Sequence, residues 1–292
     1  MGKLKVIKSG LMLTIQDEGR LGYRQFGIPQ SGAMDKDAMH LANELVGNRA
    51  DLPVVEFAVQ GIKLEAVETT TIAITGARTD IRINDNRATL NTSYKVVSGD
   101  TLSISAPLEG VYSYIGIGGK IQAKKDFGSC STYLMAEFGG LNGKSLKAGD
   151  LIVSKEDSPF KRRAKEVITD CSDIEVVRML PGPEWSMLKE APDRKVFQID
   201  ASSNRMGIRL AGETISIEGS EIPSSAVIPG TVQLPAGGSP IVLLNDCQTT
   251  GGYPRIGKVI DADLGRLAQM PAGTRLKFEM ITFEEAQNLM NP

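Results

Sequence analysis

Short runs of alternating or β-branched residues recur along most of the chain and constrain its fold more than any other feature. Examples lie at residues 71–74, 80–83 and 101–104, and turn sequences at 84–86 and 98–100 separate them. Many of the 31 glycines stand at the ends of such runs, where closely spaced antiparallel strands need residues that accept positive φ. This spacing is typical of a β-barrel or β-sandwich, so the sequence predicts a mainly β protein.

Helical patterns are few and short. They lie at residues 34–46, 184–190 and 283–290. Ser31 or Asp35 is a suitable N-terminal cap for the first helix, and Thr282 with Glu285 forms a capping box for the last. Because these helices do not alternate with strands, the pattern excludes a parallel α/β sheet.

The length and one polar stretch predict two domains. A chain of 292 residues favours two, since a domain takes roughly 100 to 200 residues. Hydrophobic periodicity fades and charge rises over residues 155–173. We therefore predict an N-terminal β-barrel domain over residues 1–160 and a C-terminal β-barrel domain over residues 174–292. Residues 13–20 and 230–235 resemble each other, which favours a similar barrel opening in both halves, although the resemblance is too short to establish a repeat.

Composition and charge exclude several classes of function. The formal net charge is -2 and the pI is about 5.7, so nucleic acid and anionic lipid would not be attracted. No apolar run approaches the roughly 20 residues that a membrane-spanning helix needs. The first eight residues alternate charged and apolar side chains and lack the features of a signal peptide. We expect a cytoplasmic protein, with the basic run 161–165 as a solvated linker.

The cysteines and the single histidine argue against metal and triad chemistry. Cys130, Cys171 and Cys247 lie far apart, which fits a reducing compartment and predicts neither a disulfide framework nor a metal site. His40 lies inside the first predicted helix. We interpret it as a surface or structural histidine, so a Ser-His-Asp triad is not expected.

One segment resembles a phosphate-binding loop without matching it. Residues 139–145 end in Gly-Lys-Ser, but Phe138 occupies the place of the first glycine of GxxxxGK[ST]. Residues 146–153 then predict a turn and a strand instead of the helix that would bind phosphate. A tight turn is the preferred interpretation. No Met-Lys-Met-type biotinylation sequence occurs, so any biotin would arrive on another polypeptide.

Two polar clusters carry side chains that suit ligand binding. Residues 14–24 leave an apolar strand and place Gln16, Asp17 and Arg20 in a glycine-flanked turn. Residues 202–210 contain two arginines four positions apart, and paired guanidinium groups bind the oxygens of a carboxylate or phosphate well. Pairing of these arginines with nearby acids is an equal alternative.

The third polar cluster is the strongest candidate. Residues 240–244 form an apolar strand that ends in the polar sequence of residues 245–255. Glycines 251 and 252 permit close approach of the backbone. The side chains that follow the strand supply a base, an amide, a phenol and a cation, namely Asp246, Gln248, Tyr253 and Arg255. A structural turn is the alternative.

Together these clusters resemble the family of bacterial 5-oxoprolinase C subunits (PxpC or KipA), also known as allophanate hydrolase subunit 2 or biotin-dependent carboxyltransferase-like. The family is related to the carboxyltransferase part of urea carboxylase. The motifs that carry the resemblance are residues 14–17 with 19–20, 31–35, 42–43, 46–48, 128–129 with 131–132, 205–207 with 209–210, 230–233 and 246–254. The chain departs from the family at Asn204, where an acid is expected, and at Cys130, where a basic residue is common.

The resemblance implies a fold, a reaction and partners. It implies two cyclophilin-like β-barrel domains and a complex with a KipI/PxpB-like protein, the B subunit, and a PxpA-like protein, the A subunit. The family's complex uses ATP to open 5-oxo-L-proline to L-glutamate, with ATP bound by this chain or by a partner. Two alternatives stay open: carboxyl transfer from a partner's carboxybiotin to a urea-like substrate, and a non-enzymatic regulator that binds the B-type partner.

We predict one site, in a cleft between the two domains, because such a cleft excludes water and draws polar groups from both sides. The expected catalytic residues are Asp246 and Tyr253. The expected substrate-binding residues are Gln16, Asp17, Arg20, Arg205, Gln248 and Arg255. No metal is expected.

Overall fold

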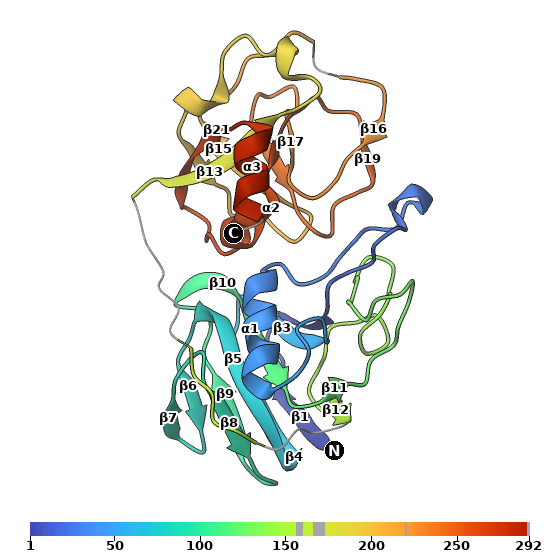
Figure 1. The fold of residues 1–292 in the computed structure, drawn as a ribbon, viewed down its shortest axis with the longest axis vertical. Helices are drawn as coiled ribbons and strands as arrows, with labels where there is room; N and C mark the ends of the chain where they lie inside the picture. Colours follow the sequence, from blue (N-terminus) through green and yellow to red (C-terminus); the bar gives the residue numbers. More distant parts are fainter. Residues whose placement is uncertain (156–159, 166–172, 220, 291–292) are drawn as a thin grey trace. The chain divides into compact units, whose positions relative to one another are not determined.

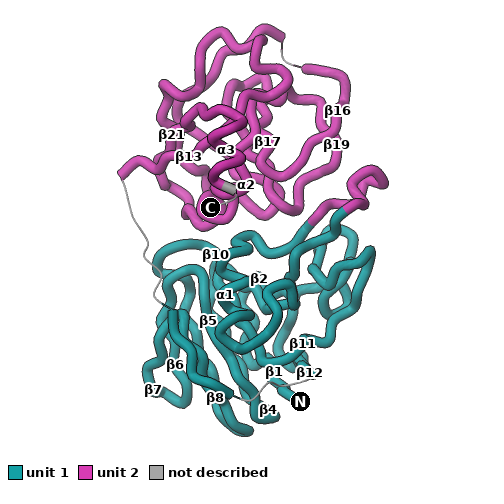
Figure 2. The backbone as a smooth tube through the Cα atoms, in the orientation of Figure 1, with its two compact units in different colours: residues 1–21, 31–168 teal, residues 22–30, 169–292 magenta. Residues whose placement is uncertain are grey.

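The computed structural model describes residues 1–155, 160–165, 173–219 and 221–290, and this part of the chain forms two compact units (Figure 2). Unit 1 comprises residues 1–21 and 31–168, and unit 2 comprises residues 22–30 and 169–292. A short N-terminal segment therefore belongs to the unit formed mainly by the C-terminal half. The predicted domains, 1–160 and 174–292, did not assign residues 22–30 to the second unit.

Unit 1 is built from two antiparallel sheets and one helix (Figure 1). The larger sheet has the order β11 (Lys120–Ile121), β12 (Leu151–Lys155), β1 (Gly2–Lys8), β4 (Ile62–Glu68), β9 (Thr101–Ile104), β6 (Ile81–Ile83) and β7 (Asn86–Ala88). The smaller has the order β2 (Met12–Gln16), β3 (Val54–Ala58), β10 (Glu109–Ile117), β5 (Thr70–Arg78) and β8 (Ser93–Val96).

The core of unit 1 follows from alternation along its strands. In β1, Leu4 and Val6 are buried while Lys5 and Ile7 are exposed, because successive side chains of a strand point to opposite faces. The core also takes side chains from both sheets, including Leu13 of β2. Apolar faces of the two sheets thus share one core.

Helix α1 (Lys36–Val46) contacts β5, β10 and β3, as Figure 1 shows. Its N-cap is Asp35, whose carboxylate accepts a hydrogen bond from the Ala38 amide at 3.0 Å. Leu45 and Val46 pack against Ala73 of β5. This cover explains why β5 is buried along most of its length instead of alternating.

Unit 2 contains a closed barrel. Its order is β13 (Glu175–Pro181), β20 (Arg255–Val259), β17 (Thr231–Gln233), β18 (Ile241–Leu243), β15 (Gly207–Gly212), β14 (Phe197–Ile199) and β21 (Arg275–Met280). The remaining elements are η1 (Arg24–Phe26), η2 (Trp185–Met187), η3 (Pro192–Arg194), β16 (Ser225–Ala226), β19 (Thr250–Gly251), α2 (Asp261–Ala268) and α3 (Phe283–Met290). Parallel pairing of β13 with β21 closes the ring.

The prediction of a mainly β fold with few short helices is confirmed. The capping box of α3 is present, because the Glu285 carboxylate accepts from the Thr282 amide and the Glu285 amide donates to the Thr282 hydroxyl. The predicted helix at 184–190 is wrong: only a short 3-10 turn forms there, and Leu188 is extended and bridges to Ile217. Helix α2 was missed, since Ile260 at its N-cap gives no side-chain cap.

Candidate functional site

Asp17 lies directly after β2 and anchors a loop of unit 1. Its carboxylate accepts hydrogen bonds from the hydroxyls of Ser129 (2.5 Å) and Ser131 (2.6 Å), and from the amides of Cys130 (2.6 Å) and Gly19 (2.9 Å). All of these donors belong to the chain itself. The arrangement satisfies the carboxylate and fixes the loop at residues 129–131.

Gln16 and Arg20 hold the same loop. The Gln16 amide nitrogen donates to the Thr132 carbonyl at 3.2 Å, and its carbonyl oxygen is buried without a partner in the described chain. Arg20 donates to the Ser131 carbonyl and lies over the ring of Phe138, 5.8 Å from its centroid. Both side chains are almost fully buried.

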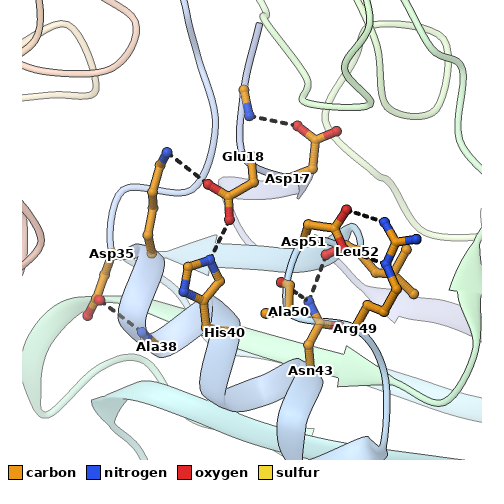
Figure 3. A network of polar contacts seen from close by, with 12 residues as sticks. Asp17, Glu18, Asp35, Ala38, His40, Asn43, Arg49, Ala50, Asp51 and Leu52 are labelled. Carbon is orange, nitrogen blue, oxygen red and sulfur yellow. Dashed lines mark hydrogen bonds and ion pairs between the residues drawn. The ribbon is translucent and has the colours of Figure 1, made fainter. Parts of the chain in front are cut away.

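Glu18 faces α1, where its carboxylate meets the His40 ring (Figure 3). Lys36 also pairs with this carboxylate, and its ammonium lies 2.9 Å from a carboxylate oxygen. The hydrogen bond from His40 is the largest cause that lowers the Glu18 pKa to about 2, and the same bond raises the pKa of His40. His40 is partly exposed and pairs with Glu18. This agrees with the prediction of a surface or structural histidine.

This pair should stabilise unit 1 within a limited pH window. The Glu18 contribution is present above its unfolded pKa of 4.5 and is lost as pH falls toward about 2. The His40 contribution is present below its unfolded pKa of 6.5 and is lost as pH rises through its raised folded pKa. We expect His40→Gln to lower the free energy of unfolding by roughly 0.5 kcal/mol near pH 5.5 and by less near pH 9. Equal effects at both pH values, measured by denaturant unfolding, would contradict this.

Asp246 and Arg205 form a buried ion pair in unit 2. The Arg205 Nε lies 2.7 Å from one carboxylate oxygen and Nη2 lies 3.1 Å from the other. The two side chains are only 8% (Arg205) and 11% (Asp246) exposed. Asp246 follows β18, and its amide donates to the Arg205 carbonyl, so backbone and side chains both connect the two segments. The Arg205 guanidinium thus contacts both oxygens of the carboxylate.

Arg255 forms a second two-bond ion pair, with Glu184. Nε and Nη2 donate to the two carboxylate oxygens at 2.9 and 2.8 Å, and the Arg255 amide donates to the same carboxylate at 2.8 Å. The pair lowers the pKa of Glu184 and raises that of Arg255. Tyr253 differs from these residues: it is 43% exposed and has no hydrogen bond to its hydroxyl from the described chain.

Gln248 joins two residues that the sequence did not assign to the site. Its amide nitrogen donates to the Gln233 carbonyl oxygen at 3.1 Å. Its backbone carbonyl accepts from Arg24 at 2.8 Å, and Arg24 also donates to the Val227 carbonyl at 2.5 Å. Arg24 lies in the segment that belongs to unit 2, which sequence position alone would not reveal. Gln233 lies in the motif of residues 230–233, and this part of the family resemblance could have identified it as a site residue.

The two free cysteines in the described chain are buried. Burial raises the pKa of the Cys247 thiol, although Arg24 lies 3.6 Å from its sulfur and acts in the opposite direction. Burial also raises the pKa of Cys130. Neither thiol is therefore activated. Cys171 lies outside the described residues.

The structure confirms that residues 139–145 form a turn. The Gly143 amide donates to the Gly139 carbonyl at 2.7 Å, and Leu141 bridges to Lys144. Gly143 has φ 69°, and a Cβ there would collide with the Glu137 backbone. Within the described residues, no group of three or more His, Cys, Asp or Glu side chains is arranged to hold a metal. No described helix is long and apolar enough to span a membrane.

The predicted residues thus form three groups. Gln16, Asp17 and Arg20 lie together in unit 1. In unit 2, Arg205 joins Asp246, while Arg255 and Tyr253 continue the segment that contains Gln248. That both units line one cleft stays a prediction.

A mainly β chain whose polar residues gather at strand ends matches a known domain class. Residues 26–280 match the carboxyltransferase domain, subdomain A and B, and the chain belongs to this family. It is 39% identical to the C subunit of 5-oxoprolinase from Escherichia coli (strain K12), over 97% of this chain and 93% of that protein.

Two further relatives extend the comparison. The chain is 37% identical to the C subunit of 5-oxoprolinase from Haemophilus influenzae (strain ATCC 51907 / DSM 11121 / KW20 / Rd), over 94% of this chain and 90% of that protein. The crystal structure of Kluyveromyces lactis urea carboxylase matches with a TM-score of 0.91 and 27% identity, covering 98% of this chain and 28% of that protein. The chain is thus similar to 5-oxoprolinase C subunits over nearly their full length and to a part of urea carboxylase.

Proposed function

We propose that this chain is the C subunit of an ATP-dependent 5-oxoprolinase and that, with the A and B subunits, it cleaves 5-oxo-L-proline to L-glutamate. The observation that carries the proposal is the similarity to two such C subunits along nearly the whole of each. The name of those relatives implies partner proteins. ATP would be bound with a partner, because residues 139–145 form a turn without a phosphate-binding helix.

The chemistry explains why ATP is needed. The lactam of 5-oxoproline is an unactivated amide, so water alone attacks it slowly. Transfer of a phosphoryl group from ATP to the lactam carbonyl oxygen would create a good leaving group. ADP would leave in this transfer. Water would then add to the same carbon and the C–N bond would break, giving γ-glutamyl phosphate. A second water would cleave this acyl phosphate and release glutamate and phosphate.

Within this chain we place the substrate-facing residues on the segment that follows β18. It offers an exposed phenol at Tyr253 and the amide of Gln248, held by two ion pairs that fix its ends. In unit 1, Asp17 is occupied by donors of its own loop. We therefore propose that Asp17 and Arg20 shape the loop at residues 129–131, while the second unit carries the chemistry.

Reconstitution tests the proposal. The chain would be co-expressed with its genomic neighbours, and glutamate release from 5-oxoproline would be measured with and without ATP. We expect ATP-dependent release by the complex, and neither ATP hydrolysis nor 5-oxoproline cleavage by the purified chain alone. A complex that forms but releases no glutamate would contradict the function, and rapid turnover by the isolated chain would contradict the need for partners.

Carboxyl transfer is a second candidate, favoured by the likeness to urea carboxylase. Against it, the chain spans only 28% of that protein and contains no Met-Lys-Met-type biotinylation sequence. The same complex, supplied with a biotinylated carrier, bicarbonate, ATP and urea, would distinguish the two. Carboxylation of urea without glutamate release would favour this alternative.

A further inference from the structure

Three arginines belong to or contact the segment after β18, and they differ in what balances their charge. Arg205 is paired with Asp246 and Arg255 with Glu184. Arg24 is different: within the described residues no carboxylate forms a salt bridge with it. A partly buried cation without a counter-charge costs free energy. Arg24 is therefore the arginine of this region whose charge is still available to an anion.

The hydrogen bonds of Arg24 use only part of its guanidinium group. Nη2 makes the contacts with Val227, Cys247 and Gln248, all of them to neutral atoms. Nη1 is buried and has no hydrogen-bond partner in the described chain. A buried donor left without an acceptor is costly, and more so when the group is charged.

A second unpartnered donor lies at the same segment. Gln233 is the last residue of β17 and is 2% exposed. Its carbonyl oxygen accepts from Gln248, but its amide nitrogen has no acceptor among the described residues. Gly251 lies directly over that nitrogen, so closely that a Cβ at this position would collide with it. Residues 248–251 thus contact both side chains that carry an unused donor.

We propose that Arg24 and Gln233 bind a small carboxylate-bearing ligand at residues 248–251. Arg24 supplies the positive charge and Nη1–H groups, and Gln233 supplies an amide donor for a further oxygen. The assignment of this ligand to the lactam substrate, which bears a carboxylate, rests on the proposed function. Binding must expose both nitrogens. Gly251, which lies over the Gln233 nitrogen, has Gly252 and the exposed Thr250 as neighbours.

The first test compares two substrates in the reconstituted complex. These are 5-oxo-L-proline and 2-pyrrolidinone, the same lactam without the carboxylate. Arg24→Gln should raise the KM for 5-oxoproline roughly ten- to hundredfold and leave binding of 2-pyrrolidinone unchanged. Arg24→Lys keeps the charge, and its KM for 5-oxoproline should lie between those of the wild type and Arg24→Gln. Arg275→Gln removes an exposed arginine of the same unit and should behave as wild type.

The second test does not depend on the reaction. The full chain would be melted in acetate, pyruvate or 5-oxoproline against chloride at equal ionic strength, with hydrogen exchange followed at residues 248–253. We expect carboxylates to raise the melting temperature and to change this exchange in the wild type. Both effects should vanish in Arg24→Gln and weaken in Gln233→Leu.

The outcomes separate the two claims. If no glutamate is formed but Arg24-dependent stabilisation by carboxylates is observed, the proposed function fails and the anion site stands. If carboxylates stabilise neither the wild type nor any variant, or if Arg24→Gln binds 5-oxoproline as tightly as wild type, the anion site is wrong.

Discussion

Asp17→Ala should lower the free energy of unfolding by about 4 kcal/mol, since a hydrogen bond to a charged group contributes roughly 1.5 to 3 kcal/mol and this carboxylate accepts several. The loss leaves the hydroxyls of Ser129 and Ser131 and the Cys130 amide without their buried acceptor. Chemical denaturation monitored by circular dichroism measures the change.

Asp17→Asn keeps the volume of the side chain and changes only its charge and its hydrogen bonding. Each carboxylate oxygen accepts from the protein, so an amide must turn its NH2 group toward a donor in either orientation. We expect it to be nearly as destabilising as alanine. Asp80→Ala, at an exposed aspartate, is the matched control and should change stability by less than about 0.5 kcal/mol. Near wild-type stability of Asp17→Asn would show that the loop does not depend on this carboxylate.

Asp246→Asn should lower the free energy of unfolding by about 3 to 5 kcal/mol, because it removes the carboxylate charge that pairs with the buried Arg205 guanidinium. The double variant Arg205→Met with Asp246→Leu removes both charges and should cost much less than the two single changes added together. The test compares the unfolding free energies of the wild type, Arg205→Met, Asp246→Leu and the double variant. Additive losses would mean that the two side chains do not depend on each other.

A loss of stability in an Asp246 variant would itself lower activity, so turnover alone does not identify a catalytic residue. A variant at Asp246 that loses turnover has also lost an ion pair that holds the segment after β18. Its catalytic role therefore stays a prediction. Variants at positions without structural contacts give the clearer answer.

Sequence patterns predicted the fold where local chemistry and tertiary packing agree. Alternation in β1 and the cap at Asp35 both mark elements that are present in the structure. Helix α2 lacked such a signal, because Ile260 precedes it without a side-chain cap. The predicted helix at residues 184–190 failed because Leu188 pairs with Ile217, a contact that no local pattern encodes.

The candidate site was predictable by residue type and less so by pairing. Arginines and acids were recognised at Arg205, Asp246 and Arg255, but the partner of Arg255 lies 71 positions away at Glu184. Such a pair depends on how the barrel strands align. Arg24 was missed for a similar reason, since its segment lies early in the sequence yet belongs to unit 2. Hydrophobic periodicity does not show to which unit such a short segment belongs.

The central claim is that the segment after β18 acts on substrate in the assembled enzyme, and Tyr253→Phe tests it most directly. The Tyr253 side chain is exposed and its hydroxyl has no hydrogen bond from the described chain, so removing this oxygen should leave folding and assembly unchanged. We predict a wild-type melting temperature and a roughly hundredfold fall in ATP-dependent glutamate release by the reconstituted complex, the scale expected for loss of a proton-transfer group. Wild-type turnover in this variant would contradict the account.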